Sequence, residues 1–149
     1  MKKISESRKL LDATSATPLK ELSTLYKGLM KTHHPDKFQD EALKHEAEAT
    51  SKKVIAAYKF LESIHPETHA QNAEVYERTI NGIVKDWHYK SLTLHVTFGD
   101  GSIYEYFGVP PNTYNKFVKA DGNARFARRH IFGSFTYRRI SGAKEVEKG

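Results

Sequence analysis

Residues 31–38 read KTHHPDKF, and they gather the side chains with the clearest chemical potential in the chain. His34 supplies an imidazole that exchanges a proton near neutral pH, and Asp36 supplies a carboxylate two residues later. Pro35 fixes its own φ and pushes the preceding residue out of the α conformation. The three residues therefore predict a turn that presents an imidazole and a carboxylate to solvent at a fixed spacing.

Two other interpretations of this turn use the same residues. A metal site would draw on His33, His34, Asp36 and His45, but adjacent histidines usually point apart, and no residue can be named to orient them. An ordinary loop would leave Asp36 to cap the next helix. Residues 65–69, HPETH, resemble zinc-protease spacing, yet the glutamate is one place late and a proline interrupts the turn, so we interpret them as a helix end. We expect no metal and no cofactor.

Composition excludes several classes of function. The chain has 149 residues, 38% hydrophobic and 28% charged, and no cysteine, which rules out disulfides, thiolate zinc sites, iron–sulfur clusters and cysteine nucleophiles. No apolar run approaches the roughly 18 residues of a membrane span, and the first residues lack the apolar stretch of a signal peptide. We expect a cytoplasmic protein with no membrane partner. No nucleophile, acid/base pair or phosphate loop stands out, so we do not expect an enzyme.

Two predicted helices position the turn. Thr17-Pro18 is a favourable helix start, with the Thr17 hydroxyl as the cap. The first helix should run to about His33 with apolar residues on one face and Lys20, Lys27 and Lys31 on the other. The second should run from about Asp40 to Ile64, where Pro66 stops it. Its apolar face should comprise Leu43, Ala47, Thr50, Val54, Ala57, Tyr58 and Leu61. The helices then form an antiparallel hairpin with the turn at its tip.

These features belong to a longer pattern. Its residues, in chain order, are Leu10-Leu11, Leu22, Tyr26-Lys27-Gly28-Leu29, His34-Pro35-Asp36-Lys37 and Val54-Ile-Ala-Ala-Tyr58-Lys-Phe-Leu61. This half resembles the J-domain of DnaJ-type co-chaperones, in which a helical hairpin carries His-Pro-Asp in its loop and stimulates the ATPase of an Hsp70 chaperone. The sequence departs from the family pattern at Ser7-Arg8-Lys9 and at His33, which replace tyrosines, and at Ser51, which replaces an aromatic residue.

The resemblance implies an Hsp70 as partner and assigns roles to the matching residues. Asp36 is expected to pair with a basic residue of the chaperone, and Pro35 to fix the turn. Lys27 and Lys31 are expected to steer the encounter with an acidic surface. The full set of expected Hsp70-binding residues is Lys20, Lys27, Lys31, His34, Pro35, Asp36 and Lys37. The reaction belongs to the Hsp70, and any client handling falls to the second half of the chain.

The second half differs from the first in its net charge and in its pattern of apolar residues. Residues 1–80 carry a net charge of +1, whereas residues 81–149 carry +5. Alternating apolar residues from Leu92 to Phe98 and from Ser102 to Phe107 predict a β-hairpin, with Gly99-Asp-Gly101 as its turn. Helices are expected after Pro110 and from Ala124 to Ile131, and a final strand from Ser134 to Ile140. We therefore expect an all-α domain at 5–72, a linker at 73–82, an α+β domain at 83–142 with an antiparallel sheet covered on one face by helices, and a tail at 143–149.

A second resemblance covers about residues 83–141. Its residues are Leu94-His-Val-Thr-Phe98, Gly101, Tyr104-Glu105-Tyr106, Val109-Pro110, Tyr114, Ala120, Arg125-Phe126, His130-Ile131 and Tyr137-Arg138-Arg139-Ile140. The segment resembles the KTSC domain, a small module found at the end of some lysyl-tRNA synthetases and in other bacterial proteins. The function of that family is not established, so the resemblance implies a fold and leaves the ligand open.

Two interpretations of this basic half stay open. Tyr104 and Tyr106 lie on one strand face, where they stack on bases if they are exposed or fill the core if they are not. The arginines Arg125, Arg128, Arg129, Arg138 and Arg139 either grip phosphates or form a solvated face. We therefore predict a J-domain co-chaperone with a second module for a partner or client, or alternatively a nucleic-acid-binding protein that uses its basic half.

Overall fold

The computed structural model describes residues 2–140 and divides the chain into two compact units, Met1–His69 and Ala70–Gly149. The first unit is all helical and the second combines helices with an antiparallel sheet, which confirms the predicted fold class. The predicted tail at 143–149 lies outside the described residues. No helix in residues 2–140 is long and apolar enough to cross a membrane.

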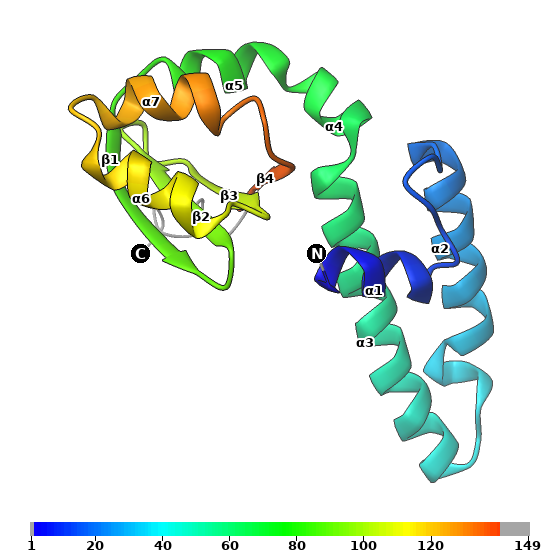
Figure 1. The fold of residues 1–149 in the computed structure, drawn as a ribbon. Helices are drawn as coiled ribbons and strands as arrows, with labels where there is room; N and C mark the ends of the chain where they lie inside the picture. Colours follow the sequence, from blue (N-terminus) through cyan, green and yellow to red (C-terminus); the bar gives the residue numbers. More distant parts are fainter. Residues whose placement is uncertain (1, 141–149) are drawn as a thin grey trace. The chain divides into compact units, whose positions relative to one another are not determined.

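The first unit is built around a helical hairpin (Figure 1). Its elements are α1 (Lys2–Leu10), α2 (Leu19–His33), the 3-10 helix η1 (Pro35–Lys37), α3 (Glu41–Ile64) and the first residues of α4 (Pro66–Gln71). Helices α2 and α3 run antiparallel, as predicted, and α1 packs across α3. Asp40 caps α3, because its carboxylate accepts a hydrogen bond from the N–H of Leu43 at 3.1 Å.

The core of this unit follows the apolar stripes of its helices. Leu22 of α2, Val54 and Leu61 of α3, and Leu11 after α1 are all buried. The rings of Tyr26 and Tyr58 stack with their centroids 4.2 Å apart, which joins α2 to α3 nearer the tip. Burial of each large apolar side chain contributes roughly 1.5–3 kcal/mol to folding, so these contacts hold the hairpin closed.

The prediction for Leu43 was wrong. It belongs to the apolar face of α3 by spacing, yet it is 49% exposed, whereas Ala47 one turn later is buried. The reason is its position in the first turn of α3, beside the residues that link the two helices. The helical period identifies a face, but only a neighbouring element can bury it.

The second unit is a four-stranded antiparallel sheet with three helices. Its elements are α5 (Ala73–Ile80), β1 (Val84–Lys90), β2 (Thr93–Phe98), β3 (Ile103–Phe107), α6 (Pro111–Lys119), α7 (Asn123–His130) and β4 (Tyr137–Arg139). The strands lie in the order β1-β2-β3-β4, and every neighbouring pair is antiparallel. The predicted hairpin of β2 and β3 is confirmed, including its turn at Gly101, whose φ of 91° suits glycine.

The core of the second unit lies on one face of this sheet. Leu94, Val96 and Phe98 occupy alternate positions of β2, and each is at most 1% exposed. They form one buried cluster with Phe117 of α6 and Ala127 of α7. The helices therefore cover the face that the sequence alternation marks as apolar.

Strand β1 was not predicted, and its turn explains why. Ser91 and Leu92 connect β1 to β2 with φ values of 50° and 63°, a left-handed conformation usually taken by Asn and Gly. Leu92 was expected to lie in a strand, but it lies in this turn and is 44% exposed. An irregularity in the pairing between Val84 and Asp86 also disturbs the alternation of β1.

Residues 73–82, expected as a linker, contain helix α5. Tyr76 in α5 donates a hydrogen bond to the carbonyl of Phe132 at 2.7 Å, and its hydroxyl lies 2.9 Å from that of Tyr106. Its ring stacks on Tyr137 of β4, with the centroids 4.2 Å apart. Burial raises the pKa of Tyr106 well above its usual value and that of Tyr137 to about 12, so these rings stay neutral at physiological pH. Helix α5 is therefore an integral part of the second unit.

Replacing Tyr76 with Phe should weaken the second unit. The substitution leaves the Phe132 carbonyl and the Tyr106 hydroxyl without their partner, so we expect the free energy of unfolding to fall by about 1–3 kcal/mol. Urea denaturation followed by the fluorescence of Trp87, the only tryptophan, measures this. Val75→Ala is the matched control, since Val75 is 40% exposed in the same helix and its loss should change stability by at most about 0.5 kcal/mol. Equal effects of the two substitutions would show that α5 does not support this unit.

Candidate functional site

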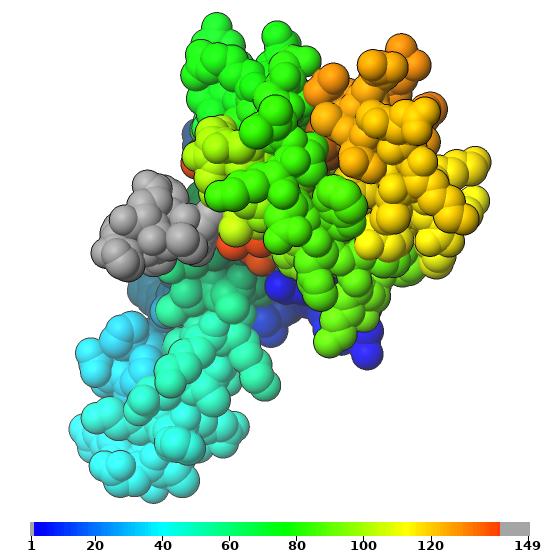
Figure 2. Space-filling view, turned by 90° about the vertical axis from the view of Figure 1, so that its left-hand side faces the viewer, coloured from blue at the N-terminus to red at the C-terminus, as the bar shows by residue number. Residues whose placement is uncertain are grey.

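The His-Pro-Asp turn lies at the tip of the helical hairpin. His34 ends α2 with extended backbone angles, φ −66° and ψ 133°, as the following proline requires. Pro35 then begins the short helix η1, in which the N–H of Phe38 donates to the Pro35 carbonyl at 3.1 Å. In the space-filling view the residues around the turn, coloured cyan, form the end of the helical unit (Figure 2).

An internal hydrogen bond orients the imidazole of His34. The N–H of Asp36 donates to Nδ1 of His34 at 3.2 Å, so the neutral ring carries its proton on Nε2. The Asp36 carboxylate lies 3.6 Å from the same nitrogen. The side chains of His34 and Asp36 are 50% and 84% exposed, and no described residue hydrogen bonds to Nε2 of His34. The turn therefore presents one N–H donor and one carboxylate to a partner.

A shallow groove of about 570 Å³ adjoins the turn. Its lining residues are Tyr26, Lys27, Met30, Lys31, His34, Asp36 and Lys37. Five of the seven residues predicted to contact an Hsp70 thus border one surface. Pro35 sits inside the turn, and Lys20 lies about two turns before Lys27 on α2 and does not border the groove.

Two departures from the J-domain pattern meet at the base of the turn. The hydroxyl of Ser51 donates to the main-chain carbonyl of His33 at 3.0 Å, and Ser51 is only 6% exposed. This carbonyl belongs to the last turn of α2, where carbonyls have no partner within the helix. Ser51 therefore ties α3 to the end of α2 directly before His34, a role that the sequence did not reveal.

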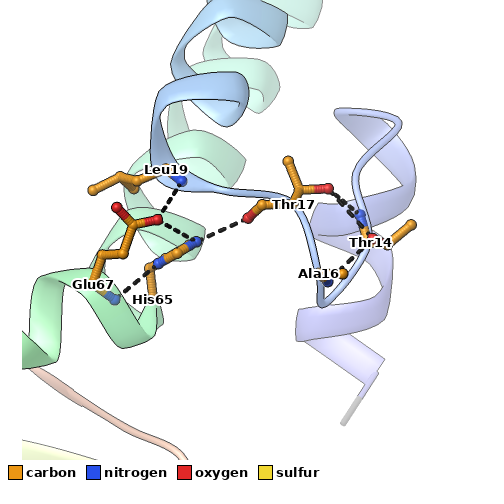
Figure 3. Close-up of polar contacts among 6 residues, drawn as sticks. All are labelled: Thr14, Ala16, Thr17, Leu19, His65 and Glu67. Atoms are coloured by element: carbon orange, nitrogen blue, oxygen red, sulfur yellow. Dashed lines mark hydrogen bonds and ion pairs between the residues drawn. The ribbon is translucent and has the colours of Figure 1, made fainter.

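A second His-Pro-acidic turn occurs at the other end of α3 (Figure 3). His65 ends α3, as predicted, with φ −69° and ψ 137°, and the N–H of Glu67 donates to its Nδ1 at 3.0 Å. Nε2 of His65 donates to the carbonyl of Thr17 at 2.9 Å. The carboxylate of Glu67 accepts from the N–H of Leu19, the first residue of α2, at 2.9 Å. This turn fastens the start of α2 to the end of α3.

The cap predicted at Thr17 is therefore supplied by another residue. The hydroxyl of Thr17 accepts from the N–H of Thr14 at 2.9 Å and takes no part in capping α2. Glu67 provides the acceptor instead, from 48 residues later in the chain. Local sequence locates the helix start correctly to within two residues, but tertiary structure decides which oxygen satisfies it.

The two turns share their backbone geometry but differ in whether their side chains bind other parts of the chain. In each, a histidine ends a helix, accepts an N–H on Nδ1 from two residues ahead, and precedes a proline that begins the next helix. At His65, whose side chain is 13% exposed, Nε2 and the carboxylate bind the main chain of residues 17–19. At His34 the corresponding groups face solvent. The tip thus offers the same hydrogen-bonding groups to an outside partner.

In the second unit, burial decides between the two interpretations of Tyr104 and Tyr106. Tyr104 and Tyr106 are 3% and 0% exposed and belong to the core cluster, which confirms the interpretation of both as core residues and contradicts the base-stacking alternative. The physical reason is the face that they share with the helices. Glu105 between them points to the opposite face, where its carboxylate pairs with Arg138 and lies 2.7 Å from Nε2 of His95.

The predicted arginines separate into different environments. Arg138 pairs with Glu105 across β3 and β4, and Arg128 donates from Nη1 to the carbonyl of Ile80 at 3.2 Å. Arg125 and Arg129 lie exposed on α7, and Arg139 lies exposed on β4. Three of the five thus lie on α7 and two on β4.

Among residues 2–140, no group of three His, Cys, Asp or Glu side chains is arranged to hold a metal ion.

Comparison with known families matches residues 83–135 to the KTSC domain. This confirms the resemblance of the second half, over about a third of the chain. The match does not extend to the helical unit, so the J-domain resemblance stays a prediction. No curated protein matches the chain.

Replacing Ser51 with Ala tests its role at the tip. Loss of the hydroxyl leaves the His33 carbonyl without its partner, so we expect stability to fall by about 1 kcal/mol and the NMR resonances of the His34 ring to broaden as the turn becomes mobile. Ser63→Ala is the matched control, because Ser63 donates within α3 to the Phe60 carbonyl at 2.6 Å, far from the tip along the helix. Unchanged His34 resonances in Ser51→Ala would contradict the assignment.

Proposed function

We propose that the helical unit is a J-domain that docks on an Hsp70 chaperone and stimulates its ATPase, while the KTSC unit binds a partner or client. The observation that carries the proposal is the groove at the tip, where His34 and Asp36 meet three lysines and two apolar side chains. Nothing in this arrangement needs a cofactor, because the hydrolysis itself belongs to the chaperone.

The internal His65 turn supports this proposal. It demonstrates within the same chain that a His-Pro-acidic turn binds main chain through Nε2 and its carboxylate. The tip repeats the turn with both groups exposed and adds positive charge around them. Exposed, preorganised polar groups beside an apolar surface are typical of docking sites, because little ordering is required on binding.

Single-turnover ATP hydrolysis by a bacterial Hsp70, measured with and without the full chain, tests the proposal. We expect the intact protein to raise the hydrolysis rate and His34→Gln to lose at least about tenfold of that effect, equivalent to about 1.4 kcal/mol. The glutamine keeps a side-chain donor but loses the Nδ1 acceptor that holds Asp36 in place. No stimulation by the intact protein, or equal stimulation by the variant, would refute docking through this turn.

The lysines provide a second test with an internal control. Lys31→Glu places a negative charge in the groove and should slow association with the same Hsp70 by roughly tenfold at low salt, with the difference shrinking as salt rises. Lys20→Glu makes the same charge change outside the groove and should have a smaller effect. Stopped-flow association rates across a salt series measure both variants. Equal slowing by the two would mean that net charge, and not the groove, guides the encounter.

A second candidate function is nucleic-acid binding by the KTSC unit. The observation in its favour is the exposed face of α7, which carries Arg125, Arg128 and Arg129 at neighbouring positions. The burial of Tyr104 and Tyr106 weakens it, since neither ring is exposed to stack on a base. Titration with single-stranded RNA across a salt series decides: binding at low salt that weakens steeply with salt supports it, and no binding at low salt removes it.

A further inference from the structure

A hollow of about 490 Å³ lies beside the start of α7 in the second unit. Residues 81–84 form one wall, and residues 122–125 with Arg128 form the other. Asn123 fixes the second wall, because its side-chain amide donates to the carbonyl of Phe117, at 2.7 Å, in the preceding helix. The volume falls in the range of pockets that bind small molecules.

Two guanidinium groups border this hollow, and a hydrogen bond restrains one of them. Nη1 of Arg128 donates to the carbonyl of Ile80 at 3.2 Å, which holds that side chain against the end of α5. Arg125 lies over Gly122, where an added Cβ would come within 3.9 Å of its Nε and Cζ atoms. These are ordinary contact distances, so the guanidinium of Arg125 lies near the backbone at Gly122.

The charge of the hollow is unbalanced. Arg125 and Arg128 are three residues apart on α7, so they share one side of the helix. None of the described residues that line the hollow is acidic. Two like charges on one side of a helix repel, and an anion between them reduces that repulsion.

We propose that this hollow binds the terminal phosphate of a nucleotide. Guanidinium groups bind phosphate oxygens in pairs through their planar array of N–H donors. A phosphate monoester carries about −1.5 to −2 charges at pH 7, which matches two arginines better than a single carboxylate does. Ile83, 71% exposed beside the hollow, offers an apolar surface for the sugar or base.

The same chemistry is present in a free mononucleotide and at the 5′ end of a nucleic acid. Both sources present one terminal phosphate next to a ribose and a base. The inference rests neither on docking to an Hsp70 nor on binding along an RNA backbone, because a single terminal phosphate fills the hollow. The ligand class proposed for the KTSC unit is therefore a nucleotide with a terminal phosphate, separate from both functions proposed above.

NMR titration of the isotopically labelled full chain tests this proposal with paired ligands. AMP and a 5′-phosphorylated hexanucleotide should shift the amide resonances of residues 81–84 and 122–125, while adenosine and the unphosphorylated hexanucleotide should not. A response to AMP alone assigns the site to mononucleotides, and a tighter response to the phosphorylated oligonucleotide assigns it to nucleic-acid ends.

Substitutions on α7 then separate the hollow from general positive charge. Arg125→Gln should weaken AMP binding at least about tenfold, since a bidentate charge pair is lost. Arg129→Gln removes the same charge from the same helix outside the hollow and should change the affinity by less than about threefold. Arg125 is the chosen site because Arg128 also anchors α5. Unchanged Trp87 fluorescence confirms that each variant is folded.

Several results would overturn the proposal. These are no shift with AMP at millimolar concentration, equal shifts with adenosine, or equal losses in Arg125→Gln and Arg129→Gln. A phosphoserine peptide that binds more tightly than AMP would reassign the hollow to a phosphorylated protein, and it would equally refute the nucleotide as ligand.

Discussion

One local interaction sets the geometry of both turns of the helical unit: a main-chain N–H donates a hydrogen bond to the imidazole Nδ1 of a histidine two residues earlier. It occurs where α2 ends, between Asp36 and His34, and where α3 ends, between Glu67 and His65. In each turn the proline prevents the preceding helix from continuing, and the hydrogen bond sets which way the ring faces. With Nδ1 occupied, Nε2 becomes the outward donor. One turn closes the hairpin internally, and the other leaves its groups exposed.

The second unit shows how packing assigns roles to residues that composition leaves ambiguous. Four tyrosines, Tyr76, Tyr104, Tyr106 and Tyr137, lie together, and burial raises the pKa of each hydroxyl. Tyr76 comes from a helix outside the matched KTSC segment, and Tyr137 comes from a strand outside it. The folded unit is therefore larger than the family match, because its core is completed from both sides of that segment.

Polar contacts complete this unit in the same way. Burial acts to raise the pKa of Asp100, but hydrogen bonds from Ser102 and Thr79, together with the positive charge of Arg139, outweigh it and lower that pKa. Thr79 lies in α5, and Asp100 lies in the turn between β2 and β3, so an ionised carboxylate links the helix to the hairpin. Arg128 links α7 to the end of α5 through a carbonyl. Asp100 and Arg128 thus connect separate elements of the unit, although in the sequence they look like ordinary surface charges.

The sequence by itself determined the helical hairpin, the β2–β3 hairpin and the location of the His-Pro-Asp turn. Apolar periodicity, proline and capping residues act within a few positions, so these features follow from local rules. It did not determine strand β1, whose Ser91-Leu92 turn lacks the usual Asn-Gly residues, or helix α5, which is stable only against the sheet. Only the tertiary structure decided that Tyr104 and Tyr106 are core, that Glu67 caps α2, and that Arg125 and Arg128 share a hollow. Those outcomes depend on contacts between residues distant in sequence. The burial of a side chain and the charges around it are set by its neighbours as well as by its own chemistry.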